Sequence, residues 1–370
     1  MKRWIGRILV IGSLLAVGGF LVAASGVVPI KASSGHWAIT EWILRFGMKR
    51  SVATHSLTVK VPENLADRGL ILTGAGYYEV GCRSCHGEPG RPQPRIAAHM
   101  LPVPPDLAPR IRESSPRKLF YVVKHGMKFT GMPAWPSENR DDEVWAMVAF
   151  LLQYPQLDAA SYRRLVGRDE ALTTSREELS TAHESISTLV QSCAKCHGLD
   201  GLGRGNSSMP TLAGQREAYM RRALEAYTNG RRHSGIMEPV ATALTRDEIV
   251  RVAEYYSSRP PRRSDATTSS GVDPESLQRG KLIANEGIRA QRVPACVECH
   301  GPGARRGKPE YPRLAGQPAT YLESQLTLFG ESRRGGSDHA HLMQPIASRL
   351  KPEQVRDVAA YFASLAAEQP

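Results

Sequence analysis

The sequence predicts an all-α chain of three tandem domains behind an N-terminal transmembrane helix. Three observations indicate this architecture. A Cys-x-x-Cys-His motif begins at Cys82, at Cys193 and at Cys296, so successive copies are 111 and 103 residues apart. Apolar and aromatic residues at helical spacing follow each copy. An uncharged run of 23 residues, from 8 to 30, lies close to the N-terminus.

The N-terminal run is long enough to cross a bilayer, because a transmembrane helix needs about 20 apolar residues. Lys2, Arg3 and Arg7 precede the run, which places the N-terminus in the cytoplasm by the positive-inside rule. A cleaved signal peptide is the alternative, with Ala23-Ala24-Ser25 as the small-residue cleavage site. Since the run is longer than the apolar part of a typical signal peptide, we favour a retained anchor. Both interpretations export the rest of the chain.

An aromatic segment follows the run. Trp37, Ile39, Trp42, Ile43 and Phe46 recur at about helical spacing. Two tryptophans this close to a membrane span suit a helix that lies at the membrane interface. The alternative is an amphipathic helix that packs on the first domain.

The three Cys-x-x-Cys-His motifs predict covalently bound c-type haem. Thiols three residues apart lie about one helical turn apart and can reach the two vinyl groups of one porphyrin, while the histidine supplies an imidazole to the iron. The motifs use all six cysteines of the chain. A structural zinc site needs four ligands where each motif offers three, and a thioredoxin-like motif would not need the histidine. The predicted haem-binding residues are Cys82, Cys85, His86, Cys193, Cys196, His197, Cys296, Cys299 and His300.

A methionine at a repeated spacing from a later aromatic residue occurs after each motif, and this repeat predicts the sixth iron ligand. Met132, Met237 and Met343 are each followed 18 residues later by an aromatic residue. A thioether opposite the histidine gives a closed iron and raises its potential. The axial ligands would then be His86 with Met132, His197 with Met237, and His300 with Met343. Other candidates near these positions are Met100, His125, Met127 and Met209, together with His233, His339 and His341, which we interpret as exposed loop histidines.

The charge of the chain constrains its partners. The formal net charge is +12, and six haem propionates would reduce it. A basic face can steer acidic proteins or lie on anionic lipid. We expect no nucleic-acid binding because the basic residues are dispersed, and the sequence has no dinucleotide or P-loop fingerprint. Arginines 221, 222, 231 and 232 could pair with propionates, but we interpret them as solvated helix faces.

All three domains resemble class I c-type cytochromes, and residues 184–366 resemble dihaem cytochrome c4, which carries a Pro-x-Leu-Ala-Gly-Gln segment in each half. This segment occurs here at 210–215 and 312–317, with a tyrosine four residues after each copy. The first domain is similar to single-haem domains that carry Gly-Met-Pro-Ala-Trp, here 131–135. The resemblance implies three class I cytochrome c domains in tandem. The expected divisions are the anchor or signal peptide 1–31, a juxtamembrane amphipathic segment 32–64, domain 1 at 65–155, a linker 156–183, domain 2 at 184–259, a linker 260–274 and domain 3 at 275–367.

The predicted function is a membrane-anchored periplasmic trihaem cytochrome of the bacterial inner membrane. It would carry single electrons between respiratory-chain partners, for example to a terminal oxidase, and would not itself be an enzyme. The alternative is the cytochrome subunit of a membrane-bound dehydrogenase complex. A haem enzyme such as a peroxidase would need an open iron, which a methionine in each domain argues against. We expect redox protein partners and no small-molecule substrate.

Overall fold

The chain folds into helices joined by loops. The computed structural model describes residues 2–28, 31, 33–166, 184–205, 208–261, 273–301, 308–336 and 338–367. Within these ranges the only extended pairing is an isolated bridge between Ile288 and Val293. The all-α prediction is therefore confirmed. The two expected linkers lie mostly outside the described residues.

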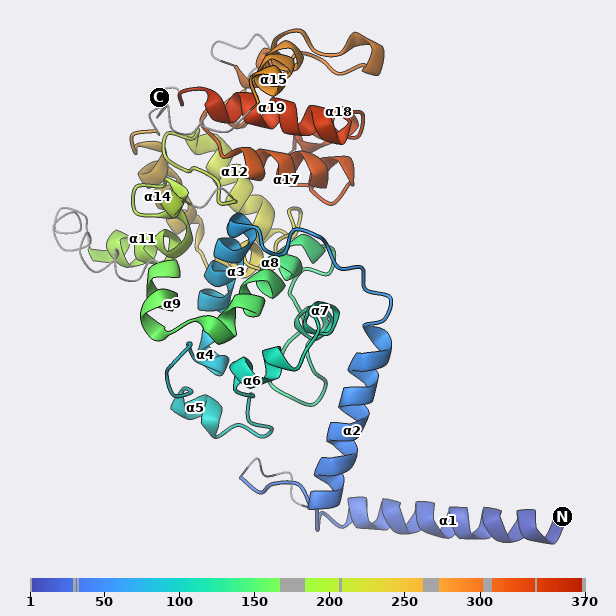
Figure 1. Cartoon of the computed structure of the whole chain (residues 1–370). Helices are drawn as coiled ribbons and strands as arrows, with labels where there is room; N and C mark the ends of the chain where they lie inside the picture. Colours follow the sequence, from blue (N-terminus) through green and yellow to red (C-terminus); the bar gives the residue numbers. More distant parts are fainter. Residues whose placement is uncertain are drawn as a thin grey trace.

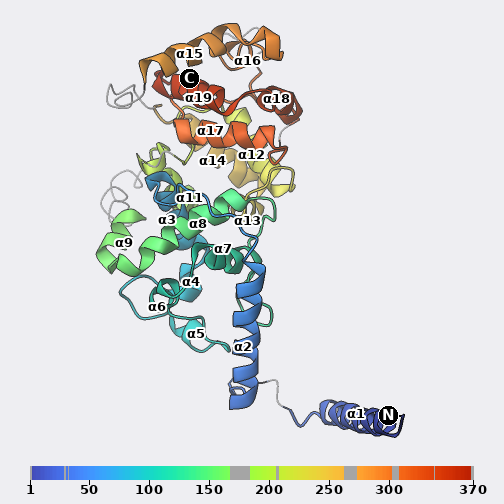
Figure 2. The ribbon, with the colours of Figure 1, turned by 45° about the vertical axis from the view of Figure 1, so that its right-hand side comes forward.

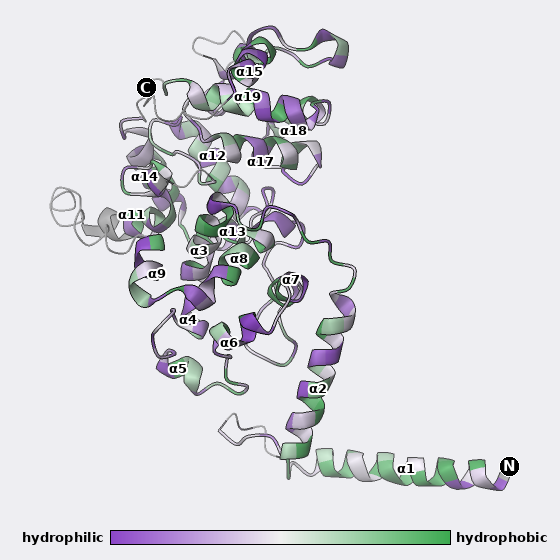
Figure 3. Ribbon diagram, in the orientation of Figure 1, coloured by the Kyte–Doolittle hydropathy of each residue, from purple (hydrophilic) through white to green (hydrophobic). Residues whose placement is uncertain are grey.

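Two helices precede the haem domains (Figure 1). Helix α1, Lys2–Ala24, is exposed along its length, and its segment Arg3–Ala24 is apolar enough to cross a membrane, a property it shares with signal sequences. Helix α2, Ala38–His55, buries none of its residues. Its C-terminal end contacts domain 1, where the ring of His55 stacks on Tyr121 at 5.8 Å. Figure 3 shows α1 as almost wholly apolar and α2 as mixed.

The three domains follow one another away from α1 in chain order, with domain 3 farthest (Figures 1 and 2). Domain 1 contains α3 Arg68–Gly81, α4 Arg83–His86, α5 Arg95–Ala98, α6 Leu107–Arg112, α7 Pro116–His125, α8 Asp141–Gln153, η1 Tyr154–Gln156 and α9 Ala159–Leu165. Domain 2 contains α11 Glu184–His197, η3 Gly203–Gly205, α12 Glu217–Thr228, α13 Met237–Thr242 and α14 Arg246–Ser257. Domain 3 contains α15 Pro274–Glu286, η5 Arg289–Gln291, α16 Val297–His300, α17 Ala319–Gly330, α18 Ala340–Ala347 and α19 Pro352–Ser364.

The first and last long helices cross in each domain. In domain 3 a Cβ at Gly280 of α15 would overlap the carbonyl oxygen of Asp357 and lie 2.9 Å from Tyr361 Cβ. In domain 1 a Cβ at Gly74 of α3 would lie 2.7 Å from the carbonyl carbon of Ala146 in α8. The missing side chains let the two backbones touch. In domain 1 this crossing holds the motif, which directly follows α3, in a fixed position relative to α8.

Local sequence explains where these helices begin. Asp67 accepts a hydrogen bond from the backbone N–H of Leu70 at 2.9 Å and so caps α3. Asp273 caps α15 in the same way. Thr245 and Glu248 form a capping box at the start of α14. Such caps satisfy backbone donors that have no partner inside the helix.

The core of domain 1 extends beyond the expected boundary at residue 155. Tyr162 of α9 and Val166 are buried against Tyr78 and Phe150. The Tyr162 hydroxyl donates to Glu79 Oε2 at 2.7 Å. The folded part of domain 1 therefore reaches residue 166. Four apolar residues of α8 that recur at helical spacing in the sequence are all buried: Val144, Met147, Val148 and Leu151.

Candidate haem sites

In domains 1 and 2 the Cys-x-x-Cys-His motif lies where the first helix ends, whereas in domain 3 the short helix η5 separates it from the end of α15. Cys82 caps α3 and precedes the short helix α4, the second motif forms the last turn of α11, and the third begins just before α16. All six cysteines are free thiols of intermediate exposure. Burial raises the pKa of Cys193 and of Cys296 to about 11, so these thiols are protonated when no haem is attached.

The motif histidines are neutral imidazoles held beside proline carbonyls. His300 Nδ1 is 2.9 Å from the Pro312 oxygen, and His86 Nδ1 is 3.5 Å from the Pro105 oxygen. Burial lowers the pKa of His197 to about 4, although the Pro210 carbonyl acts in the opposite direction. The contact between His197 Nδ1 and this carbonyl falls short of regular hydrogen-bond geometry. A carbonyl at Nδ1 leaves Nε2 available as an iron ligand.

Domains 2 and 3 share one cavity of about 430 Å³. His197 and Met237 both line it, and so do His300 and Met343. Both pairs of motif cysteines line it as well. The structure thus brings each of these predicted histidine and methionine pairs to a common space.

Two arginines, the buried Arg232 and the half-buried Arg334, line this cavity without an ion pair to any carboxylate of the described residues. Arg334 Nη2 donates to the Tyr219 hydroxyl at 3.3 Å, and Arg334 Nε is buried without a partner. Arg232 donates to Tyr321 and, at 3.4 Å, to Gln325 Oε1. Burial alone would raise the pKa of Tyr219, but the two guanidinium groups outweigh it and lower this pKa to about 8. The excess positive charge fits an anionic group, such as the propionates of haem.

Arg232 is therefore not a solvated helix residue as the sequence suggested, since it is only 9% exposed. Arg221 and Arg222 are solvated helix residues as expected. On α12 they form exposed ion pairs, Arg221 with Glu217 and Arg222 with Glu225. A repeat signal was present in the sequence, because Arg232 and Arg334 each follow the repeated tyrosine by 13 residues.

The Pro-x-Leu-Ala-Gly-Gln segments bind domains 2 and 3 to each other. The amide of Gln317 donates to the backbone oxygen of Thr211 at 2.7 Å and accepts from the backbone nitrogen of Thr211 at 3.0 Å. Gln215 makes the reciprocal pair with the backbone of Arg313, at 3.0 and 2.8 Å. Each glutamine thus satisfies both backbone groups of the variable residue in the other segment, which explains why the segment recurs.

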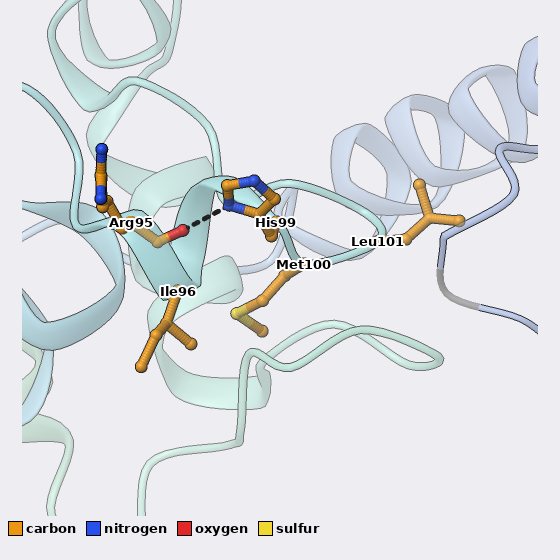
Figure 4. Close-up of a pocket in the computed structure, with 5 residues that line it drawn as sticks. All are labelled: Arg95, Ile96, His99, Met100 and Leu101. Carbon is orange, nitrogen blue, oxygen red and sulfur yellow. Dashed lines mark hydrogen bonds between the residues drawn. The ribbon is translucent and has the colours of Figure 1, made fainter.

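The first site has a different environment. Met132 is half-buried in a loop. Its backbone N–H donates a hydrogen bond to Thr130 Oγ1 at 3.1 Å. The methyl group of Met100 lies against Gly131 in the same loop. Met100 also lines a cavity of about 640 Å³ that contains none of the motif residues (Figure 4). The pairing of His86 with Met132 therefore rests on the repeated spacing.

The other candidate ligands lie in three kinds of place. His125, His233 and His341 are exposed, as expected for the last two. His339 differs from the expectation of an exposed loop histidine, because it lines the shared cavity and meets the ring of Tyr311 edge-on at 5.2 Å. Met209 is buried and lines the cavity too.

Comparison with known proteins identifies the family. Residues 69–151 match the family described as cytochrome c oxidase, cbb3-type, subunit III, and residues 184–259 and 278–366 match cytochrome c. Cytochrome c-552 of Acidithiobacillus ferridurans is 38% identical over 177 residues, which cover 47% of this chain and 73% of that protein. The chain belongs to the cytochrome c family.

Two further relatives agree with this assignment. The thiosulfate dehydrogenase electron acceptor of Thiomonas intermedia is 33% identical over 173 residues, covering 47% of this cytochrome and 78% of the relative. Cytochrome c4 of Pseudomonas aeruginosa is 31% identical over 175 residues, covering 47% and 83%. The resemblance to class I cytochromes and to cytochrome c4 is confirmed. The chain is a cytochrome c electron carrier with covalently bound haem c, and it is not itself an enzyme.

Proposed function

We propose that this cytochrome carries three haems, is tethered to the bacterial inner membrane and passes single electrons between periplasmic and membrane-bound respiratory partners. The main support is the threefold occurrence of one chemical arrangement. A pair of thiols, a neutral histidine and a proline carbonyl recur in each domain.

The residues of each domain have distinct roles in this proposal. The cysteines attach the porphyrin, and the histidine binds iron through Nε2 while its Nδ1 faces the proline carbonyl. Met132, Met237 and Met343 close the sixth position, so no site is left for a substrate. Arg232 and Arg334 neutralise the propionates in domains 2 and 3. When bound, each haem supplies an iron that changes by one electron between its ferric and ferrous states.

Helices α1 and α2 support the membrane tether. Helix α1 is apolar over a length that spans a bilayer. On α2 the side chains of Trp42 and Phe46 stack at 5.6 Å and are 62% and 56% exposed. Lys49 and Arg50 follow on the same helix and would meet anionic lipid headgroups. We infer that the exposed face of α2 lies on the periplasmic surface of the membrane.

Two comparisons bear on the redox partners. The match of domain 1 to a terminal-oxidase subunit supports delivery of electrons to an oxidase. The relative named as an electron acceptor of thiosulfate dehydrogenase supports the alternative, a cytochrome subunit that serves a dehydrogenase. Purification of the full chain in mild detergent separates the two, because a dehydrogenase subunit should copurify with a large catalytic chain in fixed proportion and an oxidase donor should not.

The haem content and ligand sets are tested by spectroscopy of the oxidised protein. A pyridine haemochrome assay should give three haems per chain, and the far-red methionine–iron(III) band should correspond to three methionine ligands. The substitutions Met132→Ala, Met237→Ala and Met343→Ala should each remove one third of that band without loss of covalent haem. Met100→Ala and His339→Ala are matched controls that should leave it unchanged. If a control variant lost part of the methionine–iron band while the corresponding methionine variant kept it, the control residue would be the iron ligand instead.

The tether is tested by N-terminal sequencing of the protein from membranes. A retained anchor should give the sequence that begins at residue 1 or 2, and the protein should resist extraction with high salt. A mature N-terminus near Ser25, with the protein in the soluble periplasmic fraction, would show that α1 is a signal peptide and would refute the tether.

A further inference from the structure

Domain 1 lies against the haem-attachment segment of domain 2. A Cβ at Gly76 of α3 would be 3.5 Å from Cys196 Sγ and 3.8 Å from the methyl carbon of Met209, both in domain 2. Thr73 and Tyr77 of the same helix line the cavity that also contains His197 and Met237. One face of α3 therefore borders the cavity shared by domains 2 and 3, close to Cys196.

A buried polar cluster holds the two domains together. Glu143 of α8 is 2% exposed, and its carboxylate accepts hydrogen bonds from Ser234 Oγ and from the backbone nitrogen of Gly235, both at 2.6 Å. Trp135 Nε1 donates to the same carboxylate at 3.0 Å. Arg140 pairs with Glu143 at 3.0 Å and donates to the His233 carbonyl at 2.6 Å. Because the polar groups of this buried network all have hydrogen-bond partners, the network fixes a single relative placement of the two domains.

The loop of domain 2 that precedes Met237 packs closely against domain 1. A Cβ at Gly235 would overlap the indole of Trp135, at 2.5 Å from Cε2 and 2.8 Å from Cδ1. Only a glycine lets the loop that leads to Met237 approach domain 1 this closely. Arg140, whose guanidinium takes part in the polar cluster, also lines the cavity that domains 2 and 3 share.

We propose that domain 1 forms one wall of the haem site of domain 2, with Tyr77, Thr73 and Arg140 as part of that site. This inference rests on the proposed function, in that it requires a haem on Cys193 and Cys196. The domain 2 site is complete only when domain 1 is docked. The wall excludes water and outside proteins from the Cys196 side, and since water favours the more highly charged ferric state, the wall raises the potential of this haem.

The wall is tested by opening it in the full chain. Gly235→Ala, Gly235→Val and Gly235→Trp push progressively against Trp135 and should separate the domains. Tyr77→Ala opens the wall by removing a ring that packs on Trp135 at 6.0 Å, but it leaves the hydrogen-bonding side chains of the polar cluster in place. Gly47→Ala, at an exposed position of α2 with nothing within 4 Å of the added carbon, is the control. For each protein we would measure the three midpoint potentials by spectroelectrochemical titration and the rate of reduction by dithionite, a small anionic reductant.

We expect one of the three potentials to fall progressively through the Gly235 series and also in Tyr77→Ala, and the corresponding haem to be reduced faster. The other two potentials should stay as in the Gly47→Ala control. Three unchanged potentials in both the Gly235 series and Tyr77→Ala would overturn the wall. A haem count below three in the unsubstituted protein would instead show that the proposed function fails, so the two failures are distinguishable.

Discussion

The helix crossing in domain 3 gives a prediction that can be worked out from its geometry. Gly280→Ala adds one methyl group where α15 meets α19. The new carbon would overlap the Asp357 carbonyl oxygen and lie 2.6 Å from its carbonyl carbon and 2.9 Å from Tyr361 Cβ. Two of these obstacles are backbone atoms, which cannot rotate away as a side chain could. The helices must therefore move apart.

Two opposing terms set the magnitude. Alanine is favoured over glycine inside a helix by about 1 kcal/mol. Overpacking a tight core costs about 1–3 kcal/mol. Because the obstacle is backbone, we expect a cost near the upper end and a net loss of about 2 kcal/mol in the free energy of unfolding of domain 3. For a domain of this size such a loss lowers the melting temperature by roughly 8–16 °C.

Calorimetry of the intact protein, with Soret circular dichroism to follow the haem environment, measures this shift. Gly47→Ala in α2 is the matched control, since its methyl group meets nothing within 4 Å. It should show only the small gain in helix propensity. If Gly280→Ala melted at or above the temperature of the unsubstituted protein, the close approach of α15 and α19 would be wrong.

Two further predictions concern domain 3. Gln317→Glu keeps the shape of the side chain but places a carboxylate oxygen against the Thr211 carbonyl. The substitution should therefore weaken the contact between domains 2 and 3 by about 1–3 kcal/mol. Calorimetry would show this as the loss of their common unfolding transition. Asp357 accepts from Arg279 Nε at 2.8 Å and from Ser276, and these hydrogen bonds, chiefly that of Arg279, lower its pKa. Its stabilising contribution is thus fully present above the ordinary carboxyl pKa of about 4 and is lost as the pH falls through the lower folded value. Asp357→Asn should therefore reduce stability at pH 7 and flatten the acid limb of the stability curve below about pH 4; an unchanged acid limb would exclude this role.

Much of the fold and of the haem-binding residues could be predicted from the sequence because their signals are local. Two thiols and a histidine must stand at fixed spacing to reach one porphyrin, and the buried face of α8 shows the helical period of its apolar residues. The recurrence of Gln215 and Gln317 was visible too. Its meaning was not, because each glutamine bonds the backbone of the other domain.

The remaining features depend on contacts between residues far apart in the chain. Arg232 has the sequence environment of a solvated residue, yet it is buried between Tyr227 of its own domain and residues of the next domain such as Gln325. Glu143 resembles an ordinary acidic residue of a first helical turn, yet its partners Ser234 and Gly235 belong to another domain. Neither the spacing nor the composition of one segment carries such information.

The contact between α3 and Cys196 also bears on how the protein matures. Gly76 lies beside the Cys196 thiol, and Tyr77 lines the cavity that this cysteine borders. If a haem is attached at Cys193 and Cys196 as proposed, its attachment would change the surface that domain 2 offers to domain 1. A failure of attachment in the middle domain would then also disturb the packing of the first domain.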